Sequence, residues 1–509
     1  MTMSFEIVEE SVLGVRMPVF RDRHRSLRAL LDTSLELGDR EYLVDGERRI
    51  TYAEHRAAVG RVAAWLTAQG VGTGDRVAIL GRNSIEWVVT FWATVSLGAI
   101  AVGLNAWWSP DEIAFGIADC EPKLLVDDMT VIAPLLSGDP VALPDVTVDE
   151  DDPAVIVYTS GTTGRAKGAT HSHRNLVGLV QAQQCVAASR IPAGVTLPPA
   201  RILASTPLFH VAGLHSGVVA ALGAGSTVIW QPGRFDPDAT LATMEREHVT
   251  NWTSVPTAVW RVVHHPDVGS YDVSSLRHIG GGGAAWSPAL QDRMREVFGP
   301  TLSYGIGYGL TESTGLATSA SFAELCEHPE SVGRAAPTVE VRVVGPVPGG
   351  PDDAKEIQIR GPLNMLGYWR NDDATRAVLD DDRWLHSGDL GELRDGMLYL
   401  TTRRTDLILR GGENVYPQEI ENCLEEHPLV GEAAVVGLPD DEFGQQVVAV
   451  VVPLTDAFVD EAGLAAHVKE RLAYFKVPSR WVMRTDPLPR NASGKVVRAD
   501  VLQQLGVNT

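Results

Sequence analysis

The spacing of apolar and polar residues switches repeatedly between two periods along the chain. Short apolar runs, such as residues 76–80 and 154–157, are typical of buried strands. Between such runs lie segments with helical punctuation, as in residues 51–70, where Thr51 and Glu54 form a capping box and Gly70 ends the helix. Strands that alternate with helices predict a layered α/β architecture with largely parallel sheets.

The same alternation continues through the middle of the chain. Proline in the first helical position predicts one helix from Asp236-Pro237 to about His248 and another from Ser287-Pro288, which Gly299 closes. The strands expected in this part are residues 202–205, 227–230, 252–255 and 276–279.

One uncharged stretch, residues 87–104, resembles a membrane span in composition. Gly98 divides it, however, and two short elements with a break do not cross a bilayer. We therefore expect a buried helix to about Leu97 and a strand at residues 99–102. The acidic N-terminus has no basic region followed by an apolar core, which argues against a secretory signal and favours a cytoplasmic protein.

The pattern changes near residue 404. Before it, residues 339–344 and 356–360 read as strands of a small β-rich subdomain. After it, about a hundred residues carry a complete pattern of their own, which predicts a separate small α+β domain. We therefore divide the chain into a large domain, 1–403, and a C-terminal domain, 404–509. The elements expected in the latter are a helix from Pro417, strands at 433–437 and 447–452, and a helix at 461–472.

Charge and cysteine usage exclude several classes of function. The net charge of −22 opposes nonspecific binding to nucleic acid and to anionic membranes. The four cysteines are scattered with no C-x-x-C spacing, which argues against a zinc site or a disulfide framework. An anionic ligand would have to be bound by locally placed cations and backbone N–H groups.

The strongest local signal is the stretch Tyr158 to Gly168, Y-T-S-G-T-T-G-R-A-K-G, directly after a predicted strand. Its glycines allow tight turns, and consecutive backbone N–H groups in such turns form an anion-binding concavity. Hydroxyl groups and a lysine add donors, which predicts a cradle for a polyphosphate. The Walker pattern and the dinucleotide fingerprint are both absent from this stretch.

This stretch resembles the phosphate-binding signature of the adenylate-forming superfamily, which includes acyl-CoA synthetases, aryl-CoA ligases, peptide-synthetase adenylation domains and beetle luciferases. The resemblance implies an enzyme that uses ATP and Mg²⁺. The residues that it places around the phosphates are Thr159, Ser160, Gly161, Thr162, Thr163, Gly164 and Lys167.

Two further glycine-containing segments resemble the nucleotide-binding elements of that family. The run 280–285 resembles its adenine-binding segment, which implies roles for Gly282, Gly283 and Ala284. The segment Tyr308-Gly309-Leu310-Thr311-Glu312 offers a ring face for the purine, the Thr311 hydroxyl for the α-phosphate and the Glu312 carboxylate as the Mg²⁺ ligand.

Two motifs further along resemble the ribose and hinge elements. Asp389, in H-S-G-D, is the implied ribose ligand, and Arg403 is the implied nucleotide contact before the hinge. Two residues depart from the hinge pattern, because Thr402 replaces glycine and Thr405 replaces the usual lysine or aspartate. The consequence of Thr405 for domain rotation is left open.

The C-terminal motifs complete the resemblance, which covers Thr51 to Lys495. Gly411 and Gly412 are implied to line the channel that admits the pantetheine arm of coenzyme A. Lys495, after P-R-N-A-S-G, is at the position of the catalytic lysine, which bridges the substrate carboxylate and the α-phosphate. The domain that carries these residues is implied to rotate between the two half-reactions.

The substrate acid is expected near His210, in the segment F-H-V-A-G, which matches the acyl-CoA and aryl-CoA ligase form. The aspartate that amino-acid adenylation domains place nearby is missing. A buried ammonium would lack a counter-charge, so an amino acid is disfavoured. We expect an acyl pocket around His210, residues 256–260 and Gly305 to Gly307, with a medium- or long-chain fatty acid as substrate and an aryl acid as the alternative.

The predicted reaction is therefore ligation of a carboxylic acid to coenzyme A through an acyl-adenylate, with Lys495, His210, Thr311 and Glu312 as catalytic residues. Three alternatives remain: loading of a carrier protein instead of coenzyme A, a luciferase-like oxygenase, and a non-catalytic nucleotide-binding protein. The sequence does not give the oligomeric state, and a homodimer is among the assemblies that it leaves open.

Overall fold

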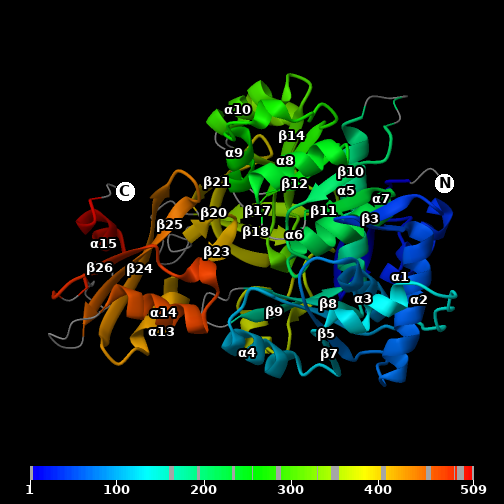
Figure 1. Cartoon of the computed structure of the whole chain (residues 1–509), viewed down its shortest axis with the longest axis horizontal. Coiled ribbons are helices and arrows are strands. Elements are labelled where there is room, and N and C mark those ends of the chain that lie inside the picture. Colours follow the sequence, from blue (N-terminus) through cyan, green and yellow to red (C-terminus); the bar gives the residue numbers. More distant parts are fainter. Residues whose placement is uncertain are drawn as a thin grey trace. The chain divides into compact units, whose positions relative to one another are not determined.

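The computed structural model describes residues 4–159, 166–191, 195, 197–231, 235–254, 256–282, 288–329, 331–345, 355–402, 408–415, 417–453, 460–486, 488–489 and 498–506. The chain forms two compact units (Figure 1). The large unit comprises residues up to 106, 120–158 and 168–401, and the small unit comprises 107–119, 159–167 and the chain from 402 onward. Each unit is described by itself below.

The main sheet of the large unit contains thirteen of the described strands and is mixed (Figure 1). Its central strands, from β14 through β13, β12, β10 and β11 to β3, pair in parallel, and the strands at both ends pair antiparallel. In order across the sheet they are β17 (Glu340–Val344), β18 (Glu356–Arg360), β20 (Leu385–Arg394), β21 (Met397–Thr402), β16 (Ser331–Ala335), β15 (Thr318–Ala320), β14 (Ser303–Tyr308), β13 (His278–Gly282), β12 (Asn251–Ser254), β10 (Arg201–Ala204), β11 (Thr227–Trp230), β3 (Glu41–Asp45) and β4 (Arg48–Thr51).

A second sheet and a hairpin complete the strands described for this unit. The second sheet pairs β5 in parallel with β6 and β7, and β6 in parallel with β8. Its order is β19 (Gly367–Tyr368), β9 (Lys167–Ser172), β8 (Pro153–Thr159), β6 (Ile100–Leu104), β5 (Arg76–Leu80) and β7 (Leu124–Val126), and the hairpin joins β1 (Ile7–Val12) to β2 (Val15–Phe20).

The helices of the large unit bury apolar faces against these sheets in two main core clusters. A third cluster packs Tyr308 with residues of α5 and of the antiparallel end of the main sheet. The helices are α1 (Leu27–Thr33), α2 (Tyr52–Ala68), α3 (Ile85–Ser96), α5 (His173–Ser189), α6 (Val211–Gly213), α7 (Ala220–Ala224), α8 (Pro237–Arg246), α9 (Pro256–Val263), α10 (Pro288–Phe298), α11 (Phe322–Glu327) and α12 (Asp372–Arg376).

Most predicted elements of the large unit are confirmed, with the largest corrections at their ends. The Thr51–Glu54 capping box starts α2 as expected. The helix expected to reach His248 ends at Arg246, because His248 adopts a left-handed φ of 47°. The strand expected at 276–279 instead runs as β13 from His278 through Gly282, because parallel pairing with β14 continues through the glycines.

The uncharged stretch 87–104 forms two buried elements, as expected. All twelve residues of α3 are buried, Gly98 turns the chain with a φ of 68°, and β6 follows as a fully buried strand. No helix in the described part of the chain is long and apolar enough to cross a membrane. The four cysteines form no disulfide.

The small unit has a five-stranded sheet, again counted over the described residues, with its own apolar core. β24 (Val430–Asp440) and β25 (Gly444–Pro453) form its long antiparallel pair. The other elements are β22 (Ile408–Arg410), β23 (Glu413–Val415), β26 (Arg480–Met483), α13 (Pro417–Glu425), α14 (Glu461–Arg471) and α15 (Arg498–Gln504), and α4 (Pro110–Cys120) from earlier in the chain.

Trp107 lies at the edge of that core. Its ring meets Tyr474 edge-on at 6.3 Å, and it packs against the apolar cluster of the small unit.

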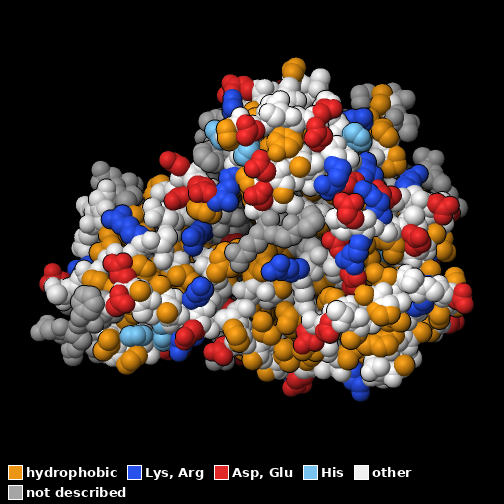
Figure 2. All heavy atoms as spheres, viewed as in Figure 1, with side chains coloured by type: hydrophobic (Ala, Val, Ile, Leu, Met, Phe, Trp, Pro, Cys, Tyr) orange, Lys and Arg blue, Asp and Glu red, His pale blue; other side chains and the backbone are white. Residues whose placement is uncertain are grey.

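On the face drawn in Figure 2, acidic and basic side chains are interspersed among apolar ones.

Candidate active site

The segment Tyr308 to Glu312 ends β14 and turns at once into a tight loop. The loop has a 3₁₀ turn at Thr311–Ser313, and the Ala317 N–H donates to the Tyr308 carbonyl at 2.7 Å. A Cβ on Gly309 would lie 2.5 Å from the backbone of Gly315, so glycine is required at this close approach. Thr311 and Glu312 are therefore presented on a rigid turn at the carboxyl end of a parallel strand, where ligands of α/β sheets usually bind.

Two predicted nucleotide ligands from distant parts of the sequence touch one another. The Tyr308 hydroxyl donates to Oδ2 of Asp389 at 2.8 Å, and both side chains are buried. Asp389 lies on β20, where its N–H donates to Ser387 Oγ at 3.0 Å and Ser387 donates to the Ile357 carbonyl at 2.6 Å. The ring predicted for the purine and the carboxylate predicted for the ribose thus form one hydrogen-bonded unit.

Glu312 is anchored at both its backbone and its side chain. The Tyr368 hydroxyl donates to Glu312 Oε1 at 2.6 Å, and the Met365 N–H donates to the Glu312 carbonyl at 2.8 Å. Tyr368 belongs to β19, which pairs with the strand that follows the glycine-rich loop, with Tyr368 opposite Ala169. A hydrogen bond to a carboxylate is stronger than one between neutral groups, so Tyr368 fixes the orientation of Glu312.

The oxygen atoms of Glu312 and Thr311 suit a hard cation whose other ligands are phosphate and water. No group of three or more His, Cys, Asp or Glu side chains able to hold a metal occurs among the described residues. A single carboxylate on a rigid turn, beside the Thr311 hydroxyl, is the arrangement by which Mg²⁺ is usually bound when it bridges phosphate oxygens.

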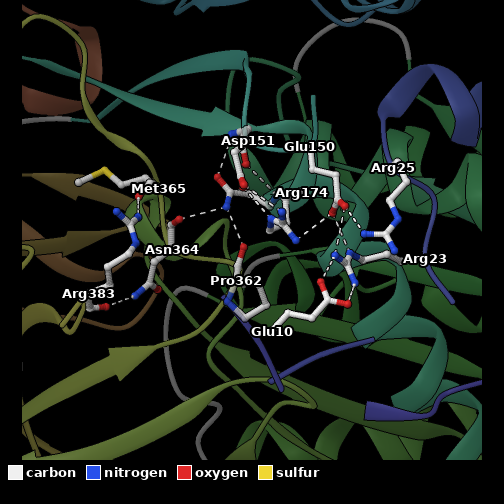
Figure 3. A network of polar contacts seen from close by, with 12 residues as sticks. Glu10, Arg23, Arg25, Glu150, Asp151, Arg174, Pro362, Asn364, Met365 and Arg383 are labelled. Carbon is white, nitrogen blue, oxygen red and sulfur yellow. Dashed lines mark hydrogen bonds and ion pairs between the residues drawn. The ribbon is translucent and has the colours of Figure 1, made fainter. Parts of the chain in front are cut away.

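A polar network supports the backbone next to this turn (Figure 3). Arg174, at the start of α5, pairs with Asp151 at 2.6 Å, and its neighbour Asn175 donates to the Asn364 carbonyl at 3.1 Å. Asn364 immediately precedes Met365, whose N–H holds the Glu312 carbonyl. The network also includes Glu10, Arg23, Arg25, Glu150, Pro362 and Arg383.

His210 lies directly before α6, on a segment that is hydrogen-bonded to a residue from another part of the chain. The Asn83 side chain accepts from the Leu208 N–H at 2.8 Å, which fixes the turn that leads to His210. A Cβ on Gly213 would overlap the Pro207 carbonyl, so this turn also requires glycine. A π-helical turn, Leu214–Val219, follows, and such turns are frequent at functional sites.

A buried histidine pair connects the segments that carry His210 and Glu312. The rings of His171 and His215 meet edge-on at 5.0 Å, and His171 Nδ1 lies 3.2 Å from the Thr314 hydroxyl. Burial lowers the pKa of His171 to about 3 and the pKa of His215 well below its usual value. Both rings are therefore neutral at physiological pH and act as packing and hydrogen-bonding groups.

The predicted adenine segment is only partly described. Gly282 ends β13, and a Cβ there would lie 3.2 Å from the Gly307 carbonyl oxygen of β14, so a larger residue would crowd the neighbouring strand. Gly283 and Ala284 lie outside the described residues.

The described ends of the predicted phosphate-binding loop, residues 159–167, belong to the small unit. Thr159 Oγ1 donates to the Lys167 carbonyl at 3.4 Å, which closes the base of the loop. The predicted site residues Ser160, Gly161, Thr162, Thr163, Gly164, Arg403 and Lys495 lie outside the described residues, and so does Thr405.

The paired glycines of the small unit form the turn between β22 and β23. Gly411 and Gly412 have φ values of 60° and 87°, which only glycine adopts readily, and the Gly411 N–H donates to the Phe443 carbonyl at 2.9 Å. Arg410 lies over the Phe443 ring at 5.4 Å. The turn is thus held in a conformation that favours glycine at both positions.

Helix α13 holds two buried carboxylates that bind cations on different segments. Glu419 accepts from Lys476 at 2.7 Å, and Lys476 also donates to Glu112 of α4 at 2.8 Å. Burial alone would lower the pKa of Lys476, but the two carboxylates outweigh it and raise that pKa, so the ammonium stays charged. Glu421 binds Arg498, three residues after Lys495, at 2.6 Å.

Sequence reasoning missed Tyr368, the histidine pair and the Glu112–Lys476–Glu419 cluster. Each depends on contacts between segments far apart in the chain, with Glu112 and Lys476 separated by 364 residues. A local signal existed only for Lys476, which lies in an apolar segment where a lysine needs a partner.

The fold and these segments define the chain as an adenylate-forming enzyme. It belongs to the AMP-binding enzyme family, whose model matches residues 32–369, and the model of the AMP-binding enzyme C-terminal domain matches residues 419–495. The chain is accordingly an AMP-forming ligase of the acyl-CoA synthetase type, as the sequence motifs predicted.

Relatives of known activity cover nearly the whole chain. A feruloyl-CoA synthase from Amycolatopsis sp is 36% identical over 479 residues, covering 91% of this chain and 95% of the relative. An indoleacetate–CoA ligase from Aromatoleum aromaticum is 36% identical over 500 residues, covering 91% and 94%. Both names describe ligases that join an aromatic acid to coenzyme A.

Solved structures support the same architecture. A double mutant of o-succinylbenzoate CoA synthetase from Bacillus subtilis, bound with a product analogue, aligns with a TM-score of 0.81 and 30% identity, covering 95% of this chain and 99% of that one. A malonyl-CoA ligase with methylmalonyl-CoA and AMP bound aligns with a TM-score of 0.75 and 30% identity, covering 89% and 97%.

Proposed function

We propose that the chain joins an aryl or arylalkanoic acid to coenzyme A, consuming ATP with Mg²⁺ and passing through an acyl-adenylate. Of the two acid classes that the sequence left open, the aryl class is favoured by the named substrates of the feruloyl and indoleacetate relatives. The fatty acid expected first remains the competing prediction.

The observation that carries the proposal is the contact between Tyr308 and Asp389, together with the anchored Glu312 on the same turn. Tyr308 would face the purine, Asp389 would accept from the ribose hydroxyls, and Thr311 would donate to the α-phosphate. Glu312 would hold Mg²⁺, which when bound neutralises phosphate charge. These fixed groups need no reorganisation during the reaction, which favours charge stabilisation in the transition state.

The reaction joins two anions, so positioning and charge neutralisation should dominate catalysis. A carboxylate oxygen, placed beside His210, attacks the α-phosphorus, and pyrophosphate leaves. The coenzyme A thiolate then attacks the acyl carbon, and AMP leaves with the oxygen of the former carboxylate. We propose that residues 404–509 act as a mobile domain that presents Lys495 for the first step and the Gly411–Gly412 turn for the second.

The phosphate loop, residues 159–167, is proposed to hold the β- and γ-phosphates. Thr159, Ser160, Thr162 and Thr163 supply hydroxyl donors, Gly161 and Gly164 allow backbone N–H groups to approach, and Lys167 supplies a positive charge. Arg403 would add a second cation near the nucleotide. Gly282, Gly283 and Ala284 would line the adenine without side-chain obstruction.

The test is pyrophosphate release with ATP and Mg²⁺ across ferulate, indole-3-acetate, benzoate, hexanoate and dodecanoate, each with and without coenzyme A. Multiple turnovers with the aromatic acids, seen only when coenzyme A is present, would support the proposal. Preference for dodecanoate would restore the fatty-acid prediction, and release unaffected by coenzyme A would indicate a carrier protein as acceptor.

A further inference from the structure

One face of the β13–β14 pair is made almost entirely of glycine. The parallel register sets Gly280 opposite Gly305 and Gly282 opposite Gly307, and side chains alternate between faces along a strand. These four positions therefore share one face, whereas Ile279, Tyr304 and Ile306 point to the other and pack in the core. The glycine face leaves a strip of bare backbone that ends near Tyr308.

The far end of this glycine strip is polar. His278 and Ser303 occupy the next positions on the same face, and His278 Nδ1 lies 2.9 Å from Ser303 Oγ. A Cβ built on Gly305 would lie 3.5 Å from Arg190 Nη1 and 3.5 Å from His278 Cε1. Arg190, at the C-terminal end of α5, thus reaches over the strip from the helix above it.

The open part of the strip is long enough for one aromatic ring. From Gly307 to Gly305, where Arg190 comes within 3.5 Å of the Cβ position, the strand advances two residues, or about 7 Å. That length matches an aromatic ring whose remote substituent faces Arg190. At Gly307, a Cβ would meet the Thr318 carbonyl oxygen at 3.5 Å and Leu316 Cδ1 at 3.9 Å, which leaves room for a flat group.

Arg190 also lines a polar pocket of about 400 Å³. Its Nη2 donates to Ser319 Oγ at 2.8 Å, which orients the guanidinium. The other polar walls include Ser321, Glu324 and Arg334, and Glu324 lies 3.3 Å from Arg334 Nε. Two arginines face one glutamate, so the pocket has an excess of positive charge.

Arg190 is exposed at this end of the strip, and Glu324 and Arg334 are the charged side chains that line the pocket with it. Burial, with a smaller contribution from Arg190, lowers the pKa of the neighbouring His278 to about 4. A charged Arg190 beside a neutral His278 would be stabilised by an oxygen atom that accepts a hydrogen bond from the guanidinium.

We infer that Arg190, with His278 beside it, recognises a polar oxygen at the end of the substrate acid remote from the reacting carboxylate. The inference rests on the proposed function and narrows its substrate to elongated acids with a distal hydroxyl, carbonyl or carboxylate oxygen. Arg190 is thus a specificity residue, separated from the reacting atoms by the length of the glycine strip.

The experiment compares cinnamate with 4-carboxycinnamate, which share the reacting carboxylate and differ at the remote end. Wild-type protein, Arg190→Met and a control, Arg376→Met, are each assayed for the KM of both acids and of ATP. Arg376 is an exposed residue of α12 paired locally with Asp373, so its loss should change neither acid. Dissociation constants for both acids are also measured by calorimetry, so that recognition is read independently of turnover.

Wild-type protein should bind 4-carboxycinnamate more tightly than cinnamate, and Arg190→Met should raise its KM and dissociation constant about 10- to 100-fold. The values for cinnamate and ATP should stay within about twofold. Equal losses for the two acids would show a merely structural role, and no loss for either would show that Arg190 does not contact the substrate; both results overturn the inference. If neither acid is turned over but the binding difference persists, the proposed reaction fails while the recognition site stands.

Discussion

The two units position their functional residues by different physical means. In the large unit, the candidate ligands Asp389 and Glu312 each accept a hydrogen bond from a tyrosine hydroxyl. The ion pair of Arg174 with Asp151 supports only the neighbouring backbone. In the small unit, helix α13 uses buried ion pairs, Glu419–Lys476 and Glu421–Arg498. Breaking a hydrogen bond from a neutral donor to a carboxylate costs about 1.5–3 kcal/mol, whereas removing one partner of a buried ion pair costs about 3–5 kcal/mol.

Each kind of contact suits the task of the unit in which it occurs. Fixed neutral donors suit a site that must hold a highly charged nucleotide without competing charges. Buried ion pairs suit a small domain with a limited apolar core, because each pair fixes one segment in a single position. The comparison predicts that the core around α13 is sensitive to loss of a charge and that the large unit is sensitive to acid.

The largest effect is expected from Lys476→Met in the small unit. The change leaves the buried Glu419 carboxylate and the half-buried Glu112 carboxylate without their cation, which should destabilise the unit by about 3–5 kcal/mol. Hydrogen exchange measured on peptides of β24 and β25 should show faster exchange, while peptides of β13 and β14 keep theirs. The exposed Lys469 provides the control, since Lys469→Met should change neither set; equal acceleration in both units would contradict the comparison.

Lys495→Ala should reduce acyl-adenylate formation by about 100-fold or more, because a charge-assisted contact to both anions is lost. Formation of thioester from supplied acyl-adenylate should remain within about threefold of wild type. The two half-reactions are measured separately, by pyrophosphate release and by thioester formation. An equal loss in both would refute the assignment of Lys495 to the first step alone.

Acid should weaken the large unit through its buried neutral histidines. Burial, with a smaller contribution from Arg56, lowers the pKa of His55 to about 3, against about 6.5 in the unfolded chain. Between these values the unfolded state binds more protons, so stability is present above pH 6.5 and falls as the pH drops toward 3. At pH 5 the loss from His55 alone is about 2 kcal/mol.

His55→Phe isolates this contribution. Its ring packs edge-on against Tyr42 at 4.8 Å, and neither ring nitrogen has a hydrogen-bonding partner among the described residues, so phenylalanine should fit. Urea unfolding of the large unit at pH 7 and pH 5 should show about 2 kcal/mol less pH dependence in the variant. An unchanged difference between the two pH values would show that His55 does not carry the effect.

Some elements of the fold could be predicted from the sequence, and others could not. The start of α2 and the position of α8 follow from residues within one turn, namely the Thr51–Glu54 capping box and the Asp236 cap, and were predicted. The range predicted for β13 began and ended too early in the chain. Its glycines have no strand propensity, and they join the sheet only because they pair with β12 and β14. Local signals define elements, and pairing between distant segments defines where they end.

The candidate site shows the same division. Glu312 and Asp389 were identified from local motifs, but their roles remain predictions. The partner of Glu312, Tyr368, is 56 residues away, and Arg190 reaches Gly305 from a different helix. No periodicity or spacing in the sequence encodes such contacts, because they depend on the order of strands in the sheets.

Tyr368→Phe should have a moderate effect. Loss of the 2.6 Å hydrogen bond frees the Glu312 carboxylate, which should raise the Mg²⁺ concentration for half-maximal adenylation about tenfold. The KM for the acid should stay unchanged. A shift in the acid KM without a shift in the Mg²⁺ requirement would contradict the role given to Glu312.

The smallest effect is expected from Tyr308→Phe. The ring that would face the purine remains, and only the hydrogen bond that orients the Asp389 carboxylate is lost. The KM for ATP should rise about fivefold with kcat nearly unchanged. Asp389→Ala should exceed this effect, and the reverse order would show that Asp389 does not bind the nucleotide.

The central claim is that the acid is activated as an adenylate, and oxygen-isotope transfer tests it most directly. The wild-type protein is incubated with an accepted acid labelled with oxygen-18 in its carboxylate, together with ATP, Mg²⁺ and coenzyme A, and the nucleotide product is analysed by mass spectrometry. The account predicts AMP that carries one labelled oxygen, because the carboxylate oxygen bonded to phosphorus leaves with AMP when the thiolate attacks. Unlabelled AMP, or ADP with label in inorganic phosphate, would contradict it.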